Sequence, residues 1–159
     1  MIVVSDTSPL RYLAVLGHLD ILPRLFGTVH CPVTVLNECR NARAPQALRD
    51  WAAMPPPWFV VMEDGQTDGS LPPLDAGEAA AISLASRLKA QAILIDERKG
   101  RRAALSLGFI TAGTLNVLAQ AGIRGWLDYQ TTVARRRAET NFRATGQLIA
   151  AVWEGVEKE

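Results

Sequence analysis

Short apolar runs that alternate with helical segments constrain the fold of this chain more than any other feature. Runs rich in valine and isoleucine, such as residues 2–4 and 92–95, are typical of strands buried on both faces of a sheet. Parallel strands require crossover connections, and the helices in those connections then cover both faces. The sequence therefore predicts an α/β fold, a three-layer α/β/α sandwich whose parallel sheet has four to five strands.

The expected elements follow from hydrophobic periodicity and from proline and glycine signals. Strand patterns fall at residues 2–4, 28–31, 58–62, 92–95 and 109–111. Helical patterns fall at residues 9–16, 19–25, 32–38, 45–54, 75–88, 100–107, 114–121, 126–137 and 142–157. Ser8 and Pro9 predict the start of the first of these helices, with serine as the N-cap and proline at the first helical position.

The length and the composition favour one globular domain. With 159 residues, 48% of them hydrophobic and 21% charged, the chain can bury a core and is neither a disordered tail nor a disulfide scaffold. We expect a single domain over residues 1–159, with a core at 1–122 and C-terminal helices at 123–159. No apolar run reaches the roughly 18 residues of a membrane helix, and the N-terminus does not resemble a signal peptide, so we expect a cytoplasmic location.

Chemistry in this chain is expected to depend on carboxylates. The two histidines, His18 and His30, have no His, Cys or acidic partner at a metal-ligand spacing. The two cysteines, Cys31 and Cys39, match no zinc spacing and suggest reduced, packed thiols. A net charge of +1 neither favours nor excludes a nucleic-acid partner.

Two aspartates follow strands of the expected sheet. Asp6 comes within two residues of the first strand, and Asp96 directly follows the fourth. In open α/β sheets the ligand site lies outside the carboxyl ends of the strands. Each aspartate alone could be an ordinary helix-start residue. Two acids at neighbouring strand ends repel each other unless a cation lies between them, and this pairing favours a functional site.

Three further acids are candidates that also have an ordinary structural interpretation. Asp75 and Glu78 have the spacing of a capping box at a helix N-terminus. If that helix begins at the same edge of the sheet, Asp75 can cap it while Glu78 points into the site. Glu38 lies on the helix after the second strand and is either a solvated surface residue or a member of the same site.

Four motifs occur in the order and at the spacings of a known family. They are residues 5–10 (SDTSPL), Glu38, residues 74–82 (LDAGEAAAI) and residues 95–101 (IDERKGR). Together they resemble the PIN-domain family, and more narrowly its VapC-like toxin nucleases that carry Gly-Glu at the third acidic position. The resemblance spans residues 2–120, and Phe142–Arg143 with the helix expected after them is similar to the C-terminal segment of that branch.

The resemblance implies a three-layer nuclease that hydrolyses RNA with Mg²⁺ or Mn²⁺. It implies metal-binding and catalytic roles for Asp6, Glu38, Glu78 and Asp96, with Ser8 as a supporting hydroxyl. The commoner PIN pattern has aspartate at the third acidic position, so Asp75 stays open as a substitute ligand or as a residue that supports the ligands, and Glu97 as an extra acid. The resemblance further implies a homodimer and a small antitoxin protein as partner.

Carboxylates suit this chemistry independently of the resemblance. Mg²⁺ prefers carboxylate oxygens and keeps several of its waters. A metal-bound water is more acidic and can attack phosphorus, while the ion neutralises charge on the phosphoryl group. Basic residues that begin just after Asp96 could hold the phosphate backbone of RNA, and these are Arg98, Lys99, Arg101 and Arg102. A solvated basic helix face is the alternative interpretation of this segment.

Three other hypotheses stay open. A PIN-like nuclease could act in RNA processing without an antitoxin. A phosphohydrolase of the haloacid-dehalogenase type also has a strand followed by aspartate, but it needs a second aspartate where this chain has Ser8. A receiver-like regulatory domain needs an isolated aspartate at the end of its third strand, where this chain has Glu63 and Asp64.

Overall fold

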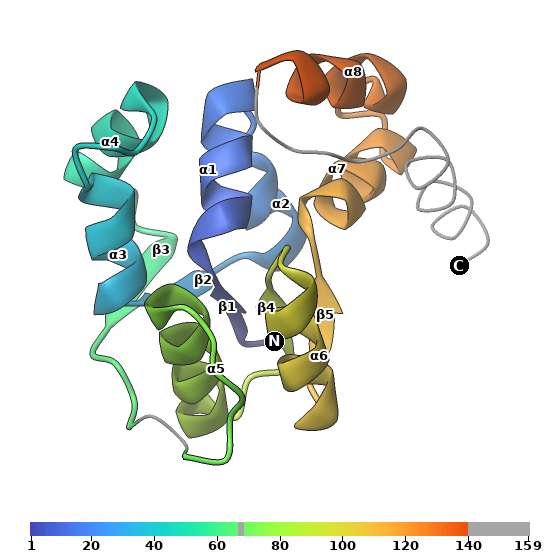
Figure 1. The fold of residues 1–159 in the computed structure, drawn as a ribbon. Coiled ribbons are helices and arrows are strands. Elements are labelled where there is room, and N and C mark those ends of the chain that lie inside the picture. The colour runs from blue at the N-terminus through green and yellow to red at the C-terminus, as the bar shows by residue number, and fades with distance from the viewer. Residues whose placement is uncertain (67–68, 140–159) are drawn as a thin grey trace.

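The computed structural model describes residues 1–66 and 69–139, and its centre is a five-stranded parallel sheet (Figure 1). The strands are β1 (Val3–Ser5), β2 (Val29–Pro32), β3 (Phe59–Met62), β4 (Ala92–Leu94) and β5 (Ile110–Ala112). Their order across the sheet is β3-β2-β1-β4-β5, and every neighbouring pair is parallel. The carboxyl end of β1 is therefore the point where the strand order reverses, which is where a ligand site is expected in such sheets.

Eight helices lie in the part of the chain that the structure describes. They are α1 (Thr7–Leu16), α2 (Ile21–Phe26), α3 (Val33–Arg40), α4 (Gln46–Ala53), α5 (Ala76–Leu88), α6 (Arg98–Ser106), α7 (Thr114–Ile123) and α8 (Tyr129–Glu139). α5 and α6 cover one face of the sheet, whereas α1, α2 and α7 cover the other, and α8 packs on α1 and α7 (Figure 1). The predicted α/β/α sandwich is confirmed.

Successive residues of the central strands face opposite layers. Val3 and Leu94 belong to the core cluster on the side of α1 and α7. Val4 and Ile93 belong to the cluster on the side of α5 and α6. All four side chains are inaccessible to solvent. Burial on both faces explains why these strands are continuous apolar runs in the sequence rather than alternating ones.

The first helix begins earlier than the sequence predicts, and its cap is a different residue. Asp6 has extended backbone angles and is the N-cap, so that Thr7 is the first helical residue and Ser8 lies inside the helix. Pro9 then occupies the third helical position, which is tolerated because the first N–H groups of a helix have no intrahelical partner. The prediction of a Ser8 cap was wrong, and the correction places Asp6 at the junction of β1 and α1.

Smaller differences concern other helix ends. α6 begins two residues earlier than predicted, so Arg98 stands in its first turn. α8 begins three residues later than predicted, because the Asp128 carboxylate accepts a hydrogen bond from the Thr131 N–H at 2.8 Å and caps the helix there. The helix expected at residues 142–157 lies outside the described residues. Among the described residues, no helix combines the length and the apolar character needed to cross a membrane.

Candidate active site

The carboxyl ends of β1 and β4 bring two candidate aspartates to one edge of the sheet. Ser5 of β1 lies opposite Leu94 of β4 in the parallel register. The Asp6 N–H donates to the Leu94 carbonyl at 2.9 Å, so the pairing continues one residue beyond β1. Asp96 follows Leu94 by two residues. The two aspartates therefore lie at neighbouring strand ends in the centre of the sheet.

Asp6 is buried in surroundings that oppose its negative charge. The residue is only 3% exposed, and burial raises the pKa of its carboxyl group to about 8. A hydrogen bond from the Thr7 N–H to this carboxylate lowers the pKa and so offsets part of the effect of burial. The nearby charges of Asp75, Glu78 and Glu38 raise the pKa further. A cation at this position would relieve the unfavourable charge of Asp6.

Glu38 reaches the site from α3. It is half-buried, and its Oε2 accepts a hydrogen bond from the Thr7 hydroxyl at the start of α1. A Cβ atom on Gly77 would lie 2.5 Å from the same oxygen, so a larger residue in the first turn of α5 would displace this carboxylate. Glu38 is therefore held between the first turns of α1 and α5 rather than on a solvated face.

The capping box predicted at the start of α5 is confirmed, and it separates an exposed acid from a buried one. The Glu78 N–H donates to Asp75 Oδ1 at 2.8 Å, and the Asp75 N–H donates to Glu78 Oε1 at 3.4 Å. Asp75 is exposed, whereas Glu78 is only 5% exposed. Burial raises the pKa of Glu78 to about 7. The side chain of Asp75 raises it further through a hydrogen bond and its charge, whereas the bond from the Asp75 N–H lowers it.

The second carboxylate oxygen of Glu78 has no partner. Within the described part of the chain, Glu78 Oε2 is buried and accepts no hydrogen bond. It lies against the first turn of α6, where a Cβ atom on Gly100 would collide with it. A buried acceptor without a donor is rare in folded proteins, and a bound cation or water is the usual explanation.

Asp96 is half-buried and already bound at both carboxylate oxygens. Its Oδ1 accepts from the Thr114 N–H and its Oδ2 from the Thr114 hydroxyl, both at 2.7 Å. These bonds satisfy a free N–H group at the start of α7, so Asp96 also caps that helix. Each carboxylate oxygen has two lone pairs, and a metal ion at Asp96 would share them with this cap.

These four acids lie at the first turns of four different helices. Asp6 caps α1, Glu38 lies against α5, Glu78 against α6 and Asp96 against α7. The N-terminus of a helix carries partial positive charge, which favours a carboxylate beside it. The topology of the sheet thus gathers the acids at one edge and compensates part of their charge. The pKa values of Asp6 and Glu78 are nevertheless raised, chiefly because both groups are buried.

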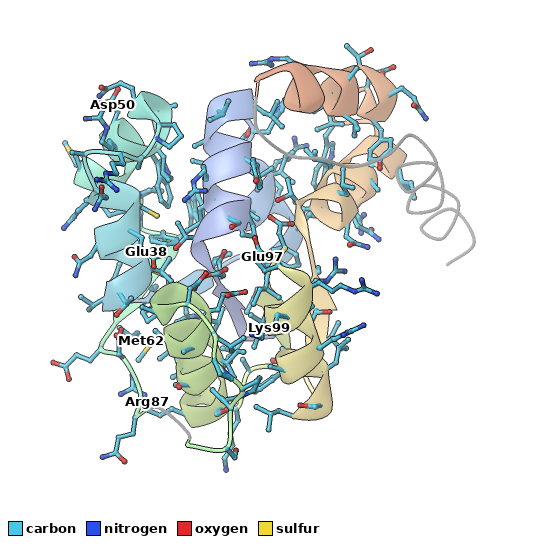
Figure 2. The ribbon with its side chains drawn as sticks, viewed as in Figure 1. Glu38, Asp50, Met62, Arg87, Glu97 and Lys99 are labelled. Carbon is cyan, nitrogen blue, oxygen red and sulfur yellow. The ribbon has the colours of Figure 1, made fainter. Side chains whose placement is uncertain are left out.

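A cleft of about 410 Å³ opens at this edge. The candidate site residues that line it are Asp6, Ser8, Glu38, Asp75 and Glu97. Figure 2 shows Glu38 on α3 and Glu97 at the beginning of α6, on opposite sides of the point where β1 passes into α1. Glu78 and Asp96 are not among the described residues that line this cleft, because the first is buried beside α6 and the second is bound to α7.

Four polar residues that the sequence analysis does not predict also line the cleft. They are Thr7, Arg11, Asn41 and Arg43. One signal for Arg11 exists in the sequence, because it stands four residues after Thr7 and therefore on the same face of the helix. No local signal exists for Asn41 and Arg43, which follow the end of α3 and reach the cleft through the packing of α3 against α1 and α5.

The basic residues predicted to bind RNA lie on α6, beside the cleft rather than in it. Arg98, Lys99 and Arg102 are exposed, and Arg101 is half-buried. None of these four is among the described residues that line the cleft. The N-cap of the same helix, Glu97, does line it, so the basic face of α6 begins at the rim of the cleft.

The donor set at this edge suits a hard divalent cation. The acids offer carboxylate oxygens, which Mg²⁺ and Mn²⁺ prefer. A cation would bind the unpartnered oxygen of Glu78 and would stabilise the negative charge of the buried Asp6. Among the described residues, no three histidine, cysteine or acidic side chains lie close enough together to hold a metal ion by themselves. An open site, in which water and substrate supply the remaining ligands, is how Mg²⁺ is commonly bound in proteins.

Comparison with known proteins identifies the family. Searches of curated proteins and of solved structures gave no match. A family model described as the PIN domain matches residues 2–158, which is nearly the whole chain. The match includes all the helices and strands described above and all the candidate acids. We conclude that the chain belongs to the PIN domain family.

Proposed function

We propose that this chain is a divalent-metal-dependent endoribonuclease whose carboxylates lie at the carboxyl edge of its sheet. PIN domains are generally nucleases, which are hydrolases acting on phosphodiester bonds, and they generally use divalent metal ions. The observation that carries the proposal in this chain is the burial of Asp6 and Glu78 close to each other, with both pKa values raised and one Glu78 oxygen unpartnered. Buried acids that oppose each other's charge are stabilised by a cation.

The candidate ligands of the ion are Asp6, Glu38, Glu78 and Asp96, with Asp75 and Glu97 nearby. When bound, the ion would supply an acidic water and neutralise charge on the phosphoryl group. Residues of the chain orient the carboxylates in advance, since the Thr7 hydroxyl donates to Glu38 and the Thr114 hydroxyl donates to Asp96. Ser8 lines the cleft, where its hydroxyl can donate to a phosphate oxygen.

RNA is the proposed substrate, and the basic face of α6 supports this choice. Arg98, Lys99, Arg101 and Arg102 follow one another along the first turns of α6, beside the cleft. Such residues attract a phosphate backbone without reading its sequence. We propose that they draw the strand toward the acidic cleft.

The proposed biological role is that of the toxin in a toxin–antitoxin pair, acting with Mg²⁺ or Mn²⁺ as a homodimer. The support is the Gly77–Glu78 pair at the third acidic position, where glycine brings α5 against Glu38. The test is a short companion reading frame whose product binds the purified protein and blocks cleavage. Absence of such a partner would favour a role in RNA processing. Light scattering of the purified protein tests the dimer.

Metal dependence is the first test of the nuclease proposal. The purified protein should cleave RNA with Mg²⁺ or Mn²⁺, and an excess of chelator should abolish cleavage. The metal should also raise the free energy of unfolding, by about 2.7 kcal/mol at a hundredfold excess over its Kd. An Asp20→Asn variant should behave like the wild type in both measurements, because Asp20 is exposed and makes no cap hydrogen bond at α2. Undiminished cleavage in excess chelator would contradict the proposal.

The capping box permits a second test, on which of its two acids belongs to the site. Asp75→Asn should retain cleavage and lower the free energy of unfolding by at most about 1 kcal/mol, because asparagine is also a good N-cap. Glu78→Gln should lose cleavage, because it removes a buried carboxylate. Urea unfolding and an RNA cleavage assay measure both effects. Loss of cleavage in a stable Asp75→Asn, with cleavage retained in Glu78→Gln, would make Asp75 the third acid.

A further inference from the structure

The cleft has a basic side as well as an acidic one. Its acidic residues are Asp6, Glu38, Asp75 and Glu97. Arg11, Asn41 and Arg43 line the same cleft, and we call these three residues the arginine side. They come from α1 and from the segment after α3, whereas the basic residues of α6 lie outside the cleft lining. A cleft of this kind fits a ligand that has one anionic group for a cation held by the acids and another for the arginines.

Arg11 carries an unused hydrogen-bond donor. The residue is half-buried, and within the described part of the chain its buried Nε has no hydrogen-bond partner. Burial raises the pKa of the Cys39 thiol to about 12, Glu38 raises it further, and Arg11 lowers it. The charges of Arg11 and Glu38 therefore both lie near Cys39, on the α3 side of the cleft. Arg11 also lines the cleft, where its guanidinium group can donate to an anionic ligand.

Asn41 and Arg43 extend this surface beyond the end of α3. Both residues are exposed. The Arg43 N–H donates to Asn41 Oδ1 at 2.9 Å, which fixes the orientation of the Asn41 amide. The carbonyl oxygen of that amide is then occupied, and its NH₂ group is left as a donor. The arginine side thus offers two guanidinium groups and one amide donor.

We propose that the arginine side binds a backbone phosphate of the RNA strand next to the phosphate held at the carboxylates. This inference rests on the proposed ribonuclease function and adds to it the path of the substrate. A guanidinium group presents its donors as a fork that matches two oxygens of a phosphate. A nucleic-acid strand repeats its phosphates, so a strand with one phosphate at the acids can present the next one to Arg11 and Arg43, which line the same cleft. The RNA then crosses α1 and the end of α3.

Binding of RNA without cleavage tests this path. The probe is a fluorescently labelled single-stranded RNA oligonucleotide, and its Kd is measured by anisotropy over a range of salt concentrations in excess chelator. The variants are Arg11→Gln and Arg43→Gln. Lys89→Gln is the matched control, because it removes one exposed positive charge from the C-terminal end of α5, at the opposite edge of the sheet. Arg11→Lys keeps the charge of Arg11 but not its forked geometry.

Each cleft substitution should weaken binding about tenfold, as expected for the loss of a charged hydrogen bond. Each should also reduce the slope of log Kd against log salt concentration by about 0.7, the value for one phosphate contact on a single strand. Arg11→Lys should restore the slope but only part of the affinity. Slopes and affinities equal to those of Lys89→Gln would overturn the proposal. Arg43 is exposed, so Arg43→Gln decides the question even if Arg11→Gln does not fold.

A parallel cleavage assay of the wild type with Mn²⁺ separates this inference from the proposed function. If the wild type cleaves RNA and the arginine variants bind RNA as the wild type does, the ribonuclease proposal stands and the proposed phosphate site at the arginine side is wrong. RNA binding that depends on Arg11 and Arg43, without cleavage by the wild type, would retain the phosphate site and overturn the nuclease.

Discussion

Replacing Asp6 by asparagine should abolish RNA cleavage and at the same time stabilise the metal-free protein at neutral pH. Asp6 is the acid at the centre of the sheet, and three other acids lie close enough to raise its pKa. Loss of one carboxylate from a metal site removes several kcal/mol of transition-state stabilisation, so we expect cleavage to fall on the order of a thousandfold or more. The measurement is initial rates of RNA cleavage with Mn²⁺.

The effect on stability follows from the raised pKa of Asp6. The folded protein holds the proton up to a pKa of about 8, whereas the unfolded chain releases it near pH 3.8, the ordinary value for aspartate. The folded state therefore binds more protons between these two pH values, and the stability of the metal-free wild type should fall as the pH rises through this window. At pH 7 the ionisation penalty is on the order of 4 kcal/mol, which Asp6→Asn removes.

Urea unfolding in chelator at a series of pH values measures this effect. The wild type should lose stability from about pH 4 to pH 8, with a further contribution from Glu78, whose pKa is raised to about 7. Asp6→Asn should show a shallower loss, and Asp20→Asn should follow the wild type. If Asp6→Asn is less stable than the wild type at pH 7 and cleaves RNA at the same rate, Asp6 is a helix cap and not a member of a metal site.

Replacing Gly100 by alanine should impair cleavage without touching any acid. A Cβ atom at this position would collide with Glu78 Oε2 and would lie 2.6 Å from Ile95 Cδ1. Either the Glu78 carboxylate or the first turn of α6 must then move. Displacement of a catalytic group by about 1 Å can reduce the rate about a hundredfold, and we expect a loss of this size. Overpacking should also lower the free energy of unfolding by about 1–3 kcal/mol, offset in part by the higher helix propensity of alanine.

Gly69→Ala is the matched control for this substitution, because no atom of the described residues beyond its chain neighbours lies within 4 Å of the Cβ position of Gly69. Cleavage rates and unfolding midpoints should be measured for both variants with and without Mn²⁺. Cleavage at the wild-type rate in a folded Gly100→Ala would mean that the position of Glu78 does not matter for the reaction.

Features fixed by nearby residues were predictable from the sequence. The capping box of Asp75 and Glu78 was predicted because both of its hydrogen bonds join residues three apart. The strands were predicted because burial on both faces leaves an unbroken apolar run. The start of α1 was predicted wrongly, because Ser8-Pro9 is a good local start signal, while the Asp6 N–H is fixed by the distant carbonyl of Leu94.

Contacts fixed by packing had no local signal in the sequence, although the family resemblance already pointed to some of the residues that make them. Glu38 has no local feature that distinguishes it from a surface residue, and its place follows from a contact with Thr7 and the approach of Gly77. The second role of Asp96, as a cap for α7, depends on Thr114, which is eighteen residues away in the sequence. Arg43 reaches the cleft only because α3 packs against α1.

The strand order has a consequence for folding of the protein during its synthesis on the ribosome. β1 is synthesised first, yet it lies in the middle of the sheet, and Val4 must find His30 on one side and Ile93 on the other. Folding can begin at the N-terminus while the chain emerges, but here β1 cannot complete its pairing until β4 has been synthesised. The Asp6 N–H is bonded to the Leu94 carbonyl. A nascent chain that ends before β4 therefore already contains Asp6, Glu38 and Glu78 but lacks the strand that fixes Asp6. If the proposed RNA cleavage is the activity of this chain, it would therefore arise only late in translation, after β4 has joined the sheet.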